Sequence, residues 1–236
     1  MKLKTTFFFT LLLGIYGFSL PFYSVSKNTI ATSPRTSKSW VSNETQLIST
    51  RNHAIDTKVL HLSLLAYANA QKKGLVAKPL LTVIDYSRPS TEKRLWVFDL
   101  RNGKALFNTY VSHGKNSGAV NATSFSNSPG SLKSSIGVFV TDDSPYIGGK
   151  GLAIRLKGLE RGVNDNAFRR NVVIHGAWYV NTANIKKNGY IGRSWGCPAV
   201  STDLIKPIIN TIKDKTMIVA YYPDRYWLNH SPFLVS

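Results

Sequence analysis

The segment Val172-Val173-Ile174-His175-Gly176 and the later segment Arg193-Ser194-Trp195-Gly196-Cys197-Pro198 are the part of the sequence from which the fold and function are inferred. The apolar run predicts a short buried strand that holds His175 at its C-terminal end. Cys197 is the single cysteine of the chain and follows a glycine in a predicted turn. A thiol is an effective nucleophile only as the thiolate, which needs a base or a positive charge nearby.

This pattern predicts that Cys197 is a nucleophile with a lowered pKa and that His175 is its base. Gly196 leaves room beside the sulfur for a substrate carbonyl, and the backbone amides of Trp195, Gly196 and Cys197 are expected to donate hydrogen bonds to the oxyanion that forms. A buried structural cysteine beside an unrelated histidine is the alternative, because free cysteine is among the most buried residue types.

The N-terminus has the layout of a secretory signal peptide, predicted over residues 1–26. A basic start is followed by an apolar run from Phe7 to Leu20, which is short for a membrane span of about 20 residues. An uncleaved anchor is the alternative, since no Ala-x-Ala cleavage site follows. Exported proteins usually hold their cysteines in disulfides, so a solitary cysteine favours a reactive thiol. The expected location is the periplasm or cell envelope.

The chain is strongly basic, with 30 Lys and Arg against 12 Asp and Glu and a formal net charge of +18. Such a charge attracts polyanions. For an exported chain we expect anionic cell-envelope polymers rather than nucleic acid as partners, and membrane contact only through an uncleaved anchor. No cofactor or metal is expected, because no spacing of His, Cys, Asp or Glu matches a known ligand set.

The rest of the chain is predicted as a flexible Ser/Thr/Asn-rich spacer (27–55), an N-terminal helix (56–78), a catalytic domain (79–225) and a tail (226–236). Asp56 is the expected N-cap of the first helix and Gly74 its C-cap signal. Asn102-Gly103 between two β-rich runs predicts a hairpin. An amphipathic helix is expected over 202–213, after Ser201 or Thr202 as the cap. Strands are predicted at 80–86, 95–100, 105–111, 136–141, 152–156, 172–174 and 216–222, and a short helix near 182–184.

These elements predict a mostly β domain with a closed or sandwiched mixed sheet and one or two peripheral helices. Helices do not alternate with the strands, which argues against a doubly wound fold.

The combination of Ile-His-Gly at a strand end with Ser-x-Gly-Cys resembles the L,D-transpeptidase (YkuD-like) catalytic domain, over roughly 80–223. The resemblance implies an enzyme that cross-links peptidoglycan through a cysteine acyl-enzyme on stem tetrapeptides, with release of D-alanine and transfer to an amine. It implies that Cys197 is the nucleophile and His175 the base. Either Ser194 or the backbone carbonyl of Gly176 would orient the imidazole.

Two departures from the family pattern leave the acceptor open. Trp195 stands where the family usually has histidine, and no arginine follows Cys197 closely. The same acyl-enzyme would support an L,D-carboxypeptidase or endopeptidase, and a non-catalytic cationic wall-binding module is a third reading. The predicted substrate-binding residues are His113, Tyr146, Arg170, Tyr179 and Arg193.

Overall fold

The computed structural model describes residues 35–235, which contain nine strands and five helices. The predicted signal peptide, the start of the spacer and Ser236 lie outside the described residues. The elements are α1 (Lys38–Arg51), α2 (Thr57–Lys72), β1 (Leu80–Asp85), β2 (Leu95–Asp99), β3 (Lys104–Thr109), β4 (Gly137–Thr141), β5 (Tyr146–Gly148), β6 (Gly151–Gly158), β7 (Val173–Gly176), α3 (Thr182–Asn188), β8 (Ala199–Val200), α4 (Thr202–Ile212), β9 (Met217–Tyr221) and α5 (Arg225–His230).

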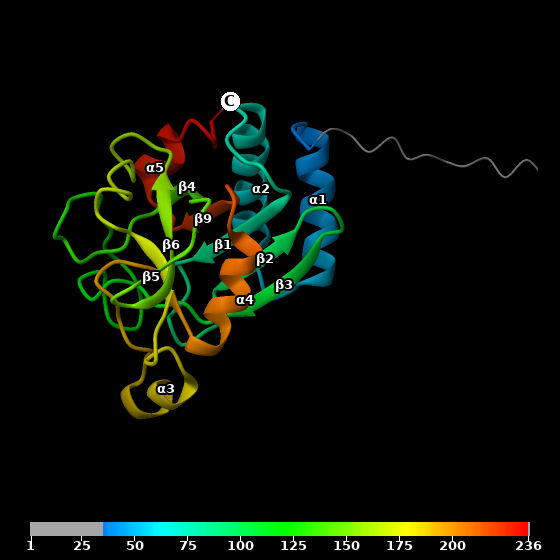
Figure 1. The fold of residues 1–236 in the computed structure, drawn as a ribbon. Helices are drawn as coiled ribbons and strands as arrows, with labels where there is room; N and C mark the ends of the chain where they lie inside the picture. Colours follow the sequence, from blue (N-terminus) through cyan, green and yellow to red (C-terminus); the bar gives the residue numbers. More distant parts are fainter. Residues whose placement is uncertain (1–34, 236) are drawn as a thin grey trace, which may run out of the picture. The chain divides into compact units, whose positions relative to one another are not determined.

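The strands form one mixed sheet in the order β3-β2-β1-β9-β4-β6-β7-β8, with β5 paired to β6 (Figure 1). β1 runs parallel to β9 and β7 parallel to β8, while the other pairs are antiparallel. After β3 the chain crosses to β8, at the opposite end of the sheet. There the Ser112 amide donates to the Ala199 carbonyl over 2.8 Å, and Gly114 forms a β-bridge with Ser194. The predicted mostly β fold with a nearly closed mixed sheet is confirmed.

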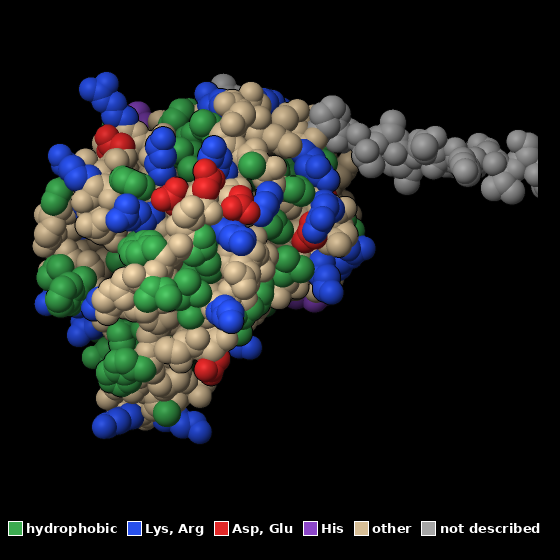
Figure 2. All heavy atoms as spheres, viewed as in Figure 1, with side chains coloured by type: hydrophobic (Ala, Val, Ile, Leu, Met, Phe, Trp, Pro, Cys, Tyr) green, Lys and Arg blue, Asp and Glu red, His purple; other side chains and the backbone are tan. Residues whose placement is uncertain are grey.

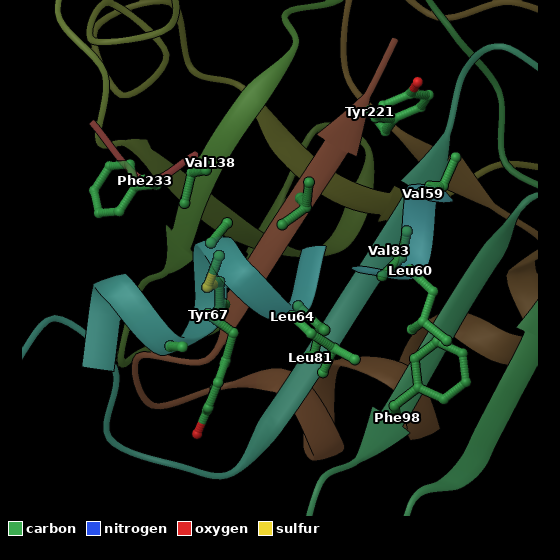
Figure 3. Close-up of a cluster of buried hydrophobic side chains, with 14 of the residues drawn as sticks. Val59, Leu60, Leu64, Tyr67, Leu81, Val83, Phe98, Val138, Tyr221 and Phe233 are labelled. Carbon is green, nitrogen blue, oxygen red and sulfur yellow. The ribbon is translucent and has the colours of Figure 1, made fainter. Parts of the chain in front are cut away.

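Strict alternation along the central strands divides the interior into two cores. Leu81 and Val83 of β1 pack toward α2, whereas Ile84 faces the layer that holds α4. Met217 and Val219 of β9 alternate in the same way with Ile218 and Ala220. Figure 3 shows α2 side chains such as Leu60 and Leu64 packed over the β1 side chains. Both faces of the central strands are therefore covered.

Most predicted elements occur close to their expected bounds. Asp56 caps α2 through hydrogen bonds from the amides of Lys58 and Val59, and the helix ends at Lys72 rather than at residue 78. Gly74 follows with a positive φ of 66°, as a helix-ending glycine does. The 95–100 and 105–111 runs pair as β2 and β3. The short strands β5 and β8 were not predicted.

The spacer prediction is wrong where the structure describes it, since α1 (Lys38–Arg51) occupies most of residues 35–55. The Ser37 hydroxyl accepts from the Trp40 amide over 3.0 Å and begins the helix. Trp40, Val41 and Ile48 are buried, and the Trp40 ring lies 6.0 Å from that of Tyr67 on α2. A narrow apolar stripe among Ser, Thr and Asn residues is enough for tertiary packing to stabilise the helix despite its composition.

The C-terminal segment, predicted only as a tail, is packed through α5. The Trp227 indole donates to the carboxylate of Glu160 at 3.0 Å, and the Ser231 hydroxyl also donates to it. The Val138 amide, in β4, supplies a third donor at 2.6 Å. A buried carboxylate that accepts several hydrogen bonds can take the place of an ion pair as an anchor. This cluster therefore fixes the end of the chain against the sheet.

No helix among residues 35–235 is long and apolar enough to cross a membrane. Figure 2 shows Lys and Arg side chains spread over the visible face, with Asp and Glu fewer in number. The basic composition is thus displayed at the surface.

Candidate active site

A cavity of about 450 Å³ lies where β7 and the turn before β8 meet the β5–β6 hairpin. Its walls combine residues from segments that are far apart in the sequence. Of the predicted site residues, those that line it are Tyr146, Arg170, His175, Tyr179, Arg193, Ser194, Trp195, Gly196 and Cys197.

The register of the short parallel pair places the thiol and the imidazole together. His175 pairs with Ala199 in this ladder. Two residues earlier on each segment are Val173 and Cys197, and the Val173 amide contacts the Cys197 thiol. Alternate residues of a strand share a face, so Val173 and His175 point the same way. His175 and Cys197 consequently reach one cavity although 21 residues separate them in the sequence.

One ring nitrogen of His175 is hydrogen-bonded to the backbone. Its Nδ1 lies 2.9 Å from the carbonyl oxygen of Gly176. A carbonyl can only accept, so Nδ1 carries the proton and Nε2 of the neutral ring is the basic atom. Of the two groups expected to orient the imidazole, the Gly176 carbonyl has this contact. Gly176 itself does not line the cavity.

Ser194 instead closes the turn that carries the cysteine. Its hydroxyl donates to the Cys197 carbonyl over 2.5 Å and accepts from the Gly196 amide over 3.1 Å. The Gly196 amide is thereby occupied, so the prediction that it serves as an oxyanion donor is wrong for this conformation. The amides of Trp195 and Cys197 donate to no other residue within 35–235 and remain candidates for that role.

The turn is also held from the side of the 116–135 loop. The Ser134 hydroxyl accepts from the Gly114 amide at 3.0 Å and donates to the Gly196 carbonyl at 3.1 Å. Gly196 has a φ of +122°, and a Cβ there would lie 2.7 Å from the Lys133 carbonyl oxygen. Only glycine permits both this backbone conformation and the close approach.

The electrostatics of the pair differ from the sequence-based prediction. Burial raises the pKa of the Cys197 thiol above its ordinary value, while the Val173 amide, Arg170 and Lys150 act in the opposite direction. The predicted low-pKa thiol is therefore wrong for the resting site, because desolvation outweighs these groups. Burial also lowers the pKa of His175, with a smaller contribution from Lys150. At neutral pH the site holds a thiol and a neutral imidazole, and Sγ donates weakly to the Asn171 carbonyl over 3.6 Å.

His113 does not line the cavity, contrary to the prediction. It is buried with 1% of its surface exposed, and its Nδ1 lies 2.8 Å from the guanidinium of Arg94. Its Nε2 lies 3.3 Å from the Gly118 carbonyl. Its own carbonyl accepts from the Ser194 amide over 2.9 Å. His113 therefore supports the backbone that carries the turn.

The other predicted substrate-binding residues fall into two groups. The Arg170 guanidinium lines the cavity, but it donates to Ser126, Ser131, Lys133 and Ser135, which ties the 126–135 loop in place. Because its donors are used in this way, Arg170 has a structural role in holding this loop.

Tyr146, Tyr179 and Arg193 line the cavity as predicted. Arg193 donates to the carbonyls of Lys115 and Gly118 at 3.2 and 3.1 Å. It thus contributes both to the wall and to the support of the neighbouring loop.

Sequence reasoning missed Lys150, Ser134 and Arg94. Lys150 lies in a Gly-Lys-Gly turn whose position over the cavity depends on the unpredicted β5–β6 pairing. Ser134 is one serine in a serine-rich loop, and Arg94 directly precedes a strand with no sign that it is buried. None of the three carries a sequence signal that separates it from a solvated residue.

The structure thus places a cysteine and a histidine at one cavity of a mixed sheet. The family model described as the L,D-transpeptidase catalytic domain matches residues 51–221, and the chain belongs to this family. The resemblance drawn from the sequence is thereby confirmed.

Similar solved structures include L,D-transpeptidase 1 of Mycobacterium tuberculosis (17% identity, 62% of this chain and 63% of that one, TM-score 0.35). An L,D-transpeptidase from Mycobacterium smegmatis has 16% identity over 61% and 59% of the two chains, with a TM-score of 0.37. One from Stackebrandtia nassauensis has 13% identity over 77% of each chain, with a TM-score of 0.36. The chain thus spans about three fifths of the length of the mycobacterial structures. No curated protein matches the sequence.

Proposed function

We propose that this protein is an exported peptidoglycan L,D-transpeptidase that forms an acyl-enzyme on Cys197. The substrate would be a stem tetrapeptide, cleaved between its third, diamino acid and its terminal D-alanine. One observation carries the proposal: Cys197 and His175 line the same cavity, and the Nδ1–H of His175 is committed to the Gly176 carbonyl, which leaves Nε2 as a base.

In the first half-reaction Nε2 of His175 takes the thiol proton as the sulfur attacks the scissile carbonyl carbon. A neutral thiol beside a neutral imidazole suits this general-base step, since the thiolate then forms only during attack. The oxyanion of the tetrahedral intermediate would accept hydrogen bonds from the amides of Trp195 and Cys197. On collapse the imidazolium returns the proton to the departing D-alanine nitrogen, and a thioester on Cys197 remains.

In the second half-reaction the amine of a neighbouring stem attacks the thioester. Nε2 accepts the amine proton, the new amide bond forms, and the proton returns to the sulfur as it leaves. Water in place of the amine would give a tripeptide by hydrolysis. An anionic wall would retain so basic a chain and raise the local concentration of acceptor stems.

The product mixture tests the proposal. The mature chain is incubated with stem tetrapeptide, and the products are separated by liquid chromatography and identified by mass. We expect dimers joined between two diamino-acid residues together with free D-alanine, and a loss of both by several orders of magnitude in Cys197→Ala. Tripeptide without dimer at high acceptor concentration would make the protein a carboxypeptidase. No turnover by a folded wild type would favour the wall-binding module.

Export is part of the same proposal, supported by the layout of residues 1–26 and by the family's action on the cell wall. Cell fractionation should find the chain in the periplasm or cell envelope. An intact precursor that stays in the cytosol would contradict access to a wall substrate.

A further inference from the structure

The cavity is cationic. Its charged lining residues in the described part of the chain are Lys150, Arg170 and Arg193, and no Asp or Glu lines it. A cavity with fixed positive charge and no carboxylate attracts an anionic group of the molecule that enters it.

Both arginines are hydrogen-bonded to other parts of the protein. The Arg170 guanidinium makes four hydrogen bonds to the loop that covers the turn. Arg193 donates to two backbone carbonyls and lies over the Tyr190 ring at 5.3 Å. Arg170 uses four of its five N–H donors in this way, and Arg193 is anchored to backbone through its Nη1 group.

Lys150 differs from both. It lies at the tip of the β5–β6 hairpin, between the paired residues Gly148 and Gly151. Its Nζ lies 4.8 Å from the centroid of the Trp195 ring. Among residues 35–235 it has no hydrogen-bond or carboxylate partner, whereas Lys78 and Lys215 have acidic partners. The indole face holds the ammonium without using its three N–H donors.

Lys150 and the Cys197 thiol line the same cavity. Trp195 is two residues before Cys197 in the same turn, and both line the cavity with Lys150. The charge of Lys150 acts on the titration of both His175 and Cys197. The ammonium and the thiol therefore face the same cavity, which any substrate of Cys197 has to enter.

We propose that Lys150, held over the indole of Trp195, binds the free carboxylate of the residue that departs from the substrate. The exposed side chain of Trp195 then has a function beyond its backbone amide, as the platform for the selecting cation. The identity of the departing residue as D-alanine rests on the proposed function, whereas the preference of the cavity for a carboxylate beside the thiol does not.

The first experiment is independent of peptidoglycan chemistry. Alkylation of Cys197 by iodoacetate is compared with alkylation by iodoacetamide, an uncharged reagent of similar size. Both reagents need the thiolate, so the ratio of their rates cancels any effect of Lys150 on the thiol pKa. Lys150→Met should lower the iodoacetate-to-iodoacetamide ratio by about fivefold, the effect of one nearby partly solvated charge. Lys150→Arg should retain most of the ratio.

Lys157→Met is the matched control. Lys157 is exposed on β6, the same strand that begins after Lys150, and it lines a separate pocket with Phe168. Its variant carries the same change in net charge and should keep the ratio within about twofold, because exposed charges far from the site are screened. Trp195→Leu should lower the ratio in the same direction as Lys150→Met. An unchanged ratio in Lys150→Met, or an equal fall in Lys157→Met, would overturn the proposal.

The second experiment compares a stem tetrapeptide with its C-terminal amide. Lys150→Met should lower kcat/KM for the acid about tenfold more than for the amide, mainly through KM, because any effect on the thiol and imidazole is common to both substrates. An equal loss for both substrates would overturn the selection of the departing carboxylate while leaving the transpeptidase proposal intact. If neither substrate turns over, the proposed function fails and the alkylation ratio still decides whether Lys150 selects anions.

Discussion

The chain contains two Ser/Ile-His-Gly segments that look alike in sequence and differ in what their histidines contact. His113 and His175 each follow a predicted strand and precede a glycine, and each is nearly fully buried, with 1% and 4% of its surface exposed. Burial lowers the pKa of both rings. Both nitrogens of His113 are occupied, by Arg94 and by the Gly118 carbonyl, whereas Nδ1 is the one ring nitrogen of His175 with a partner among residues 35–235.

Arg94 explains the inert state of His113. Its guanidinium is completely buried, donates to the carbonyls of Val111 and Arg88, and lies over the Tyr86 ring. No carboxylate pairs with it among the described residues, so a second positive charge on His113 would be strongly opposed. An imidazole whose two nitrogens are both occupied is a positioning group, and one with a nitrogen to spare can move a proton.

The largest expected effect separates the two histidines by activity. His175→Ala should lower D-alanine release by about 10²- to 10⁴-fold, the usual contribution of a general acid-base group. His113→Gln, which keeps a donor and an acceptor, should stay within about tenfold of the wild type while lowering the melting temperature. Activity assays with thermal melts of both variants make the comparison. Equal losses of activity in two folded variants would show that His113 has a share in the chemistry.

The sequence was sufficient to predict that Cys197 and His175 lie at one site, because the apolar strand and the glycine turn are local features; their roles as nucleophile and base stay predictions. It was also sufficient for the hairpin at Asn102-Gly103 and the amphipathic α4. The role of His113 could not be predicted, since it depends on the buried guanidinium of Arg94, which lies just before β2, 19 residues earlier in the sequence.

The helices α1 and α5 were also not predicted, because contacts with distant parts of the chain stabilise them. α1 is stabilised by packing against α2 rather than by its own helix propensity, and α5 is anchored through Trp227 to a carboxylate 67 residues away. The raised pKa of the Cys197 thiol is likewise a consequence of burial, which residue order does not reveal.

The second prediction concerns how the free energy of unfolding depends on pH. Burial beside Arg94 lowers the pKa of His113 from 6.5 to about 4 in the folded protein. Between these values the unfolded chain binds a proton that the folded chain does not, so acid favours unfolding. His113 should therefore contribute up to about 3 kcal/mol of stability above pH 6.5 that is lost as the pH falls toward 4.

Urea unfolding at pH 7 and pH 4.5 checks this contribution. His113→Gln should lose less stability between the two pH values than the wild type, whereas His175→Gln should keep the part of the loss that His113 causes. The difference between variants removes the contribution of the carboxylates that titrate in the same window. A wild-type loss that is unchanged in His113→Gln would refute the assignment.

The smallest effect compares the glycines that follow the two histidines. A Cβ on Gly114 would lie 2.4 Å from the Leu132 carbonyl oxygen and 2.9 Å from Cα of Gly196, which are both backbone atoms. A Cβ on Gly176 would lie 2.9 Å from a methyl carbon of Ile205, whose side chain can shift. Gly114→Ala should therefore cost about 3 kcal/mol and Gly176→Ala about 1 kcal/mol, the two ends of the range for overpacking.

The two alanine variants should also differ in where the strain appears. The clash at Gly114 pushes on the turn that carries Cys197, so the iodoacetamide labelling rate should change in Gly114→Ala. The clash at Gly176 is absorbed between β7 and α4, so labelling in Gly176→Ala should stay close to the wild type. Urea unfolding and labelling of both proteins give the test. A larger loss of stability in Gly176→Ala would mean that the His113 segment, rather than the His175 strand, has the freedom to adjust.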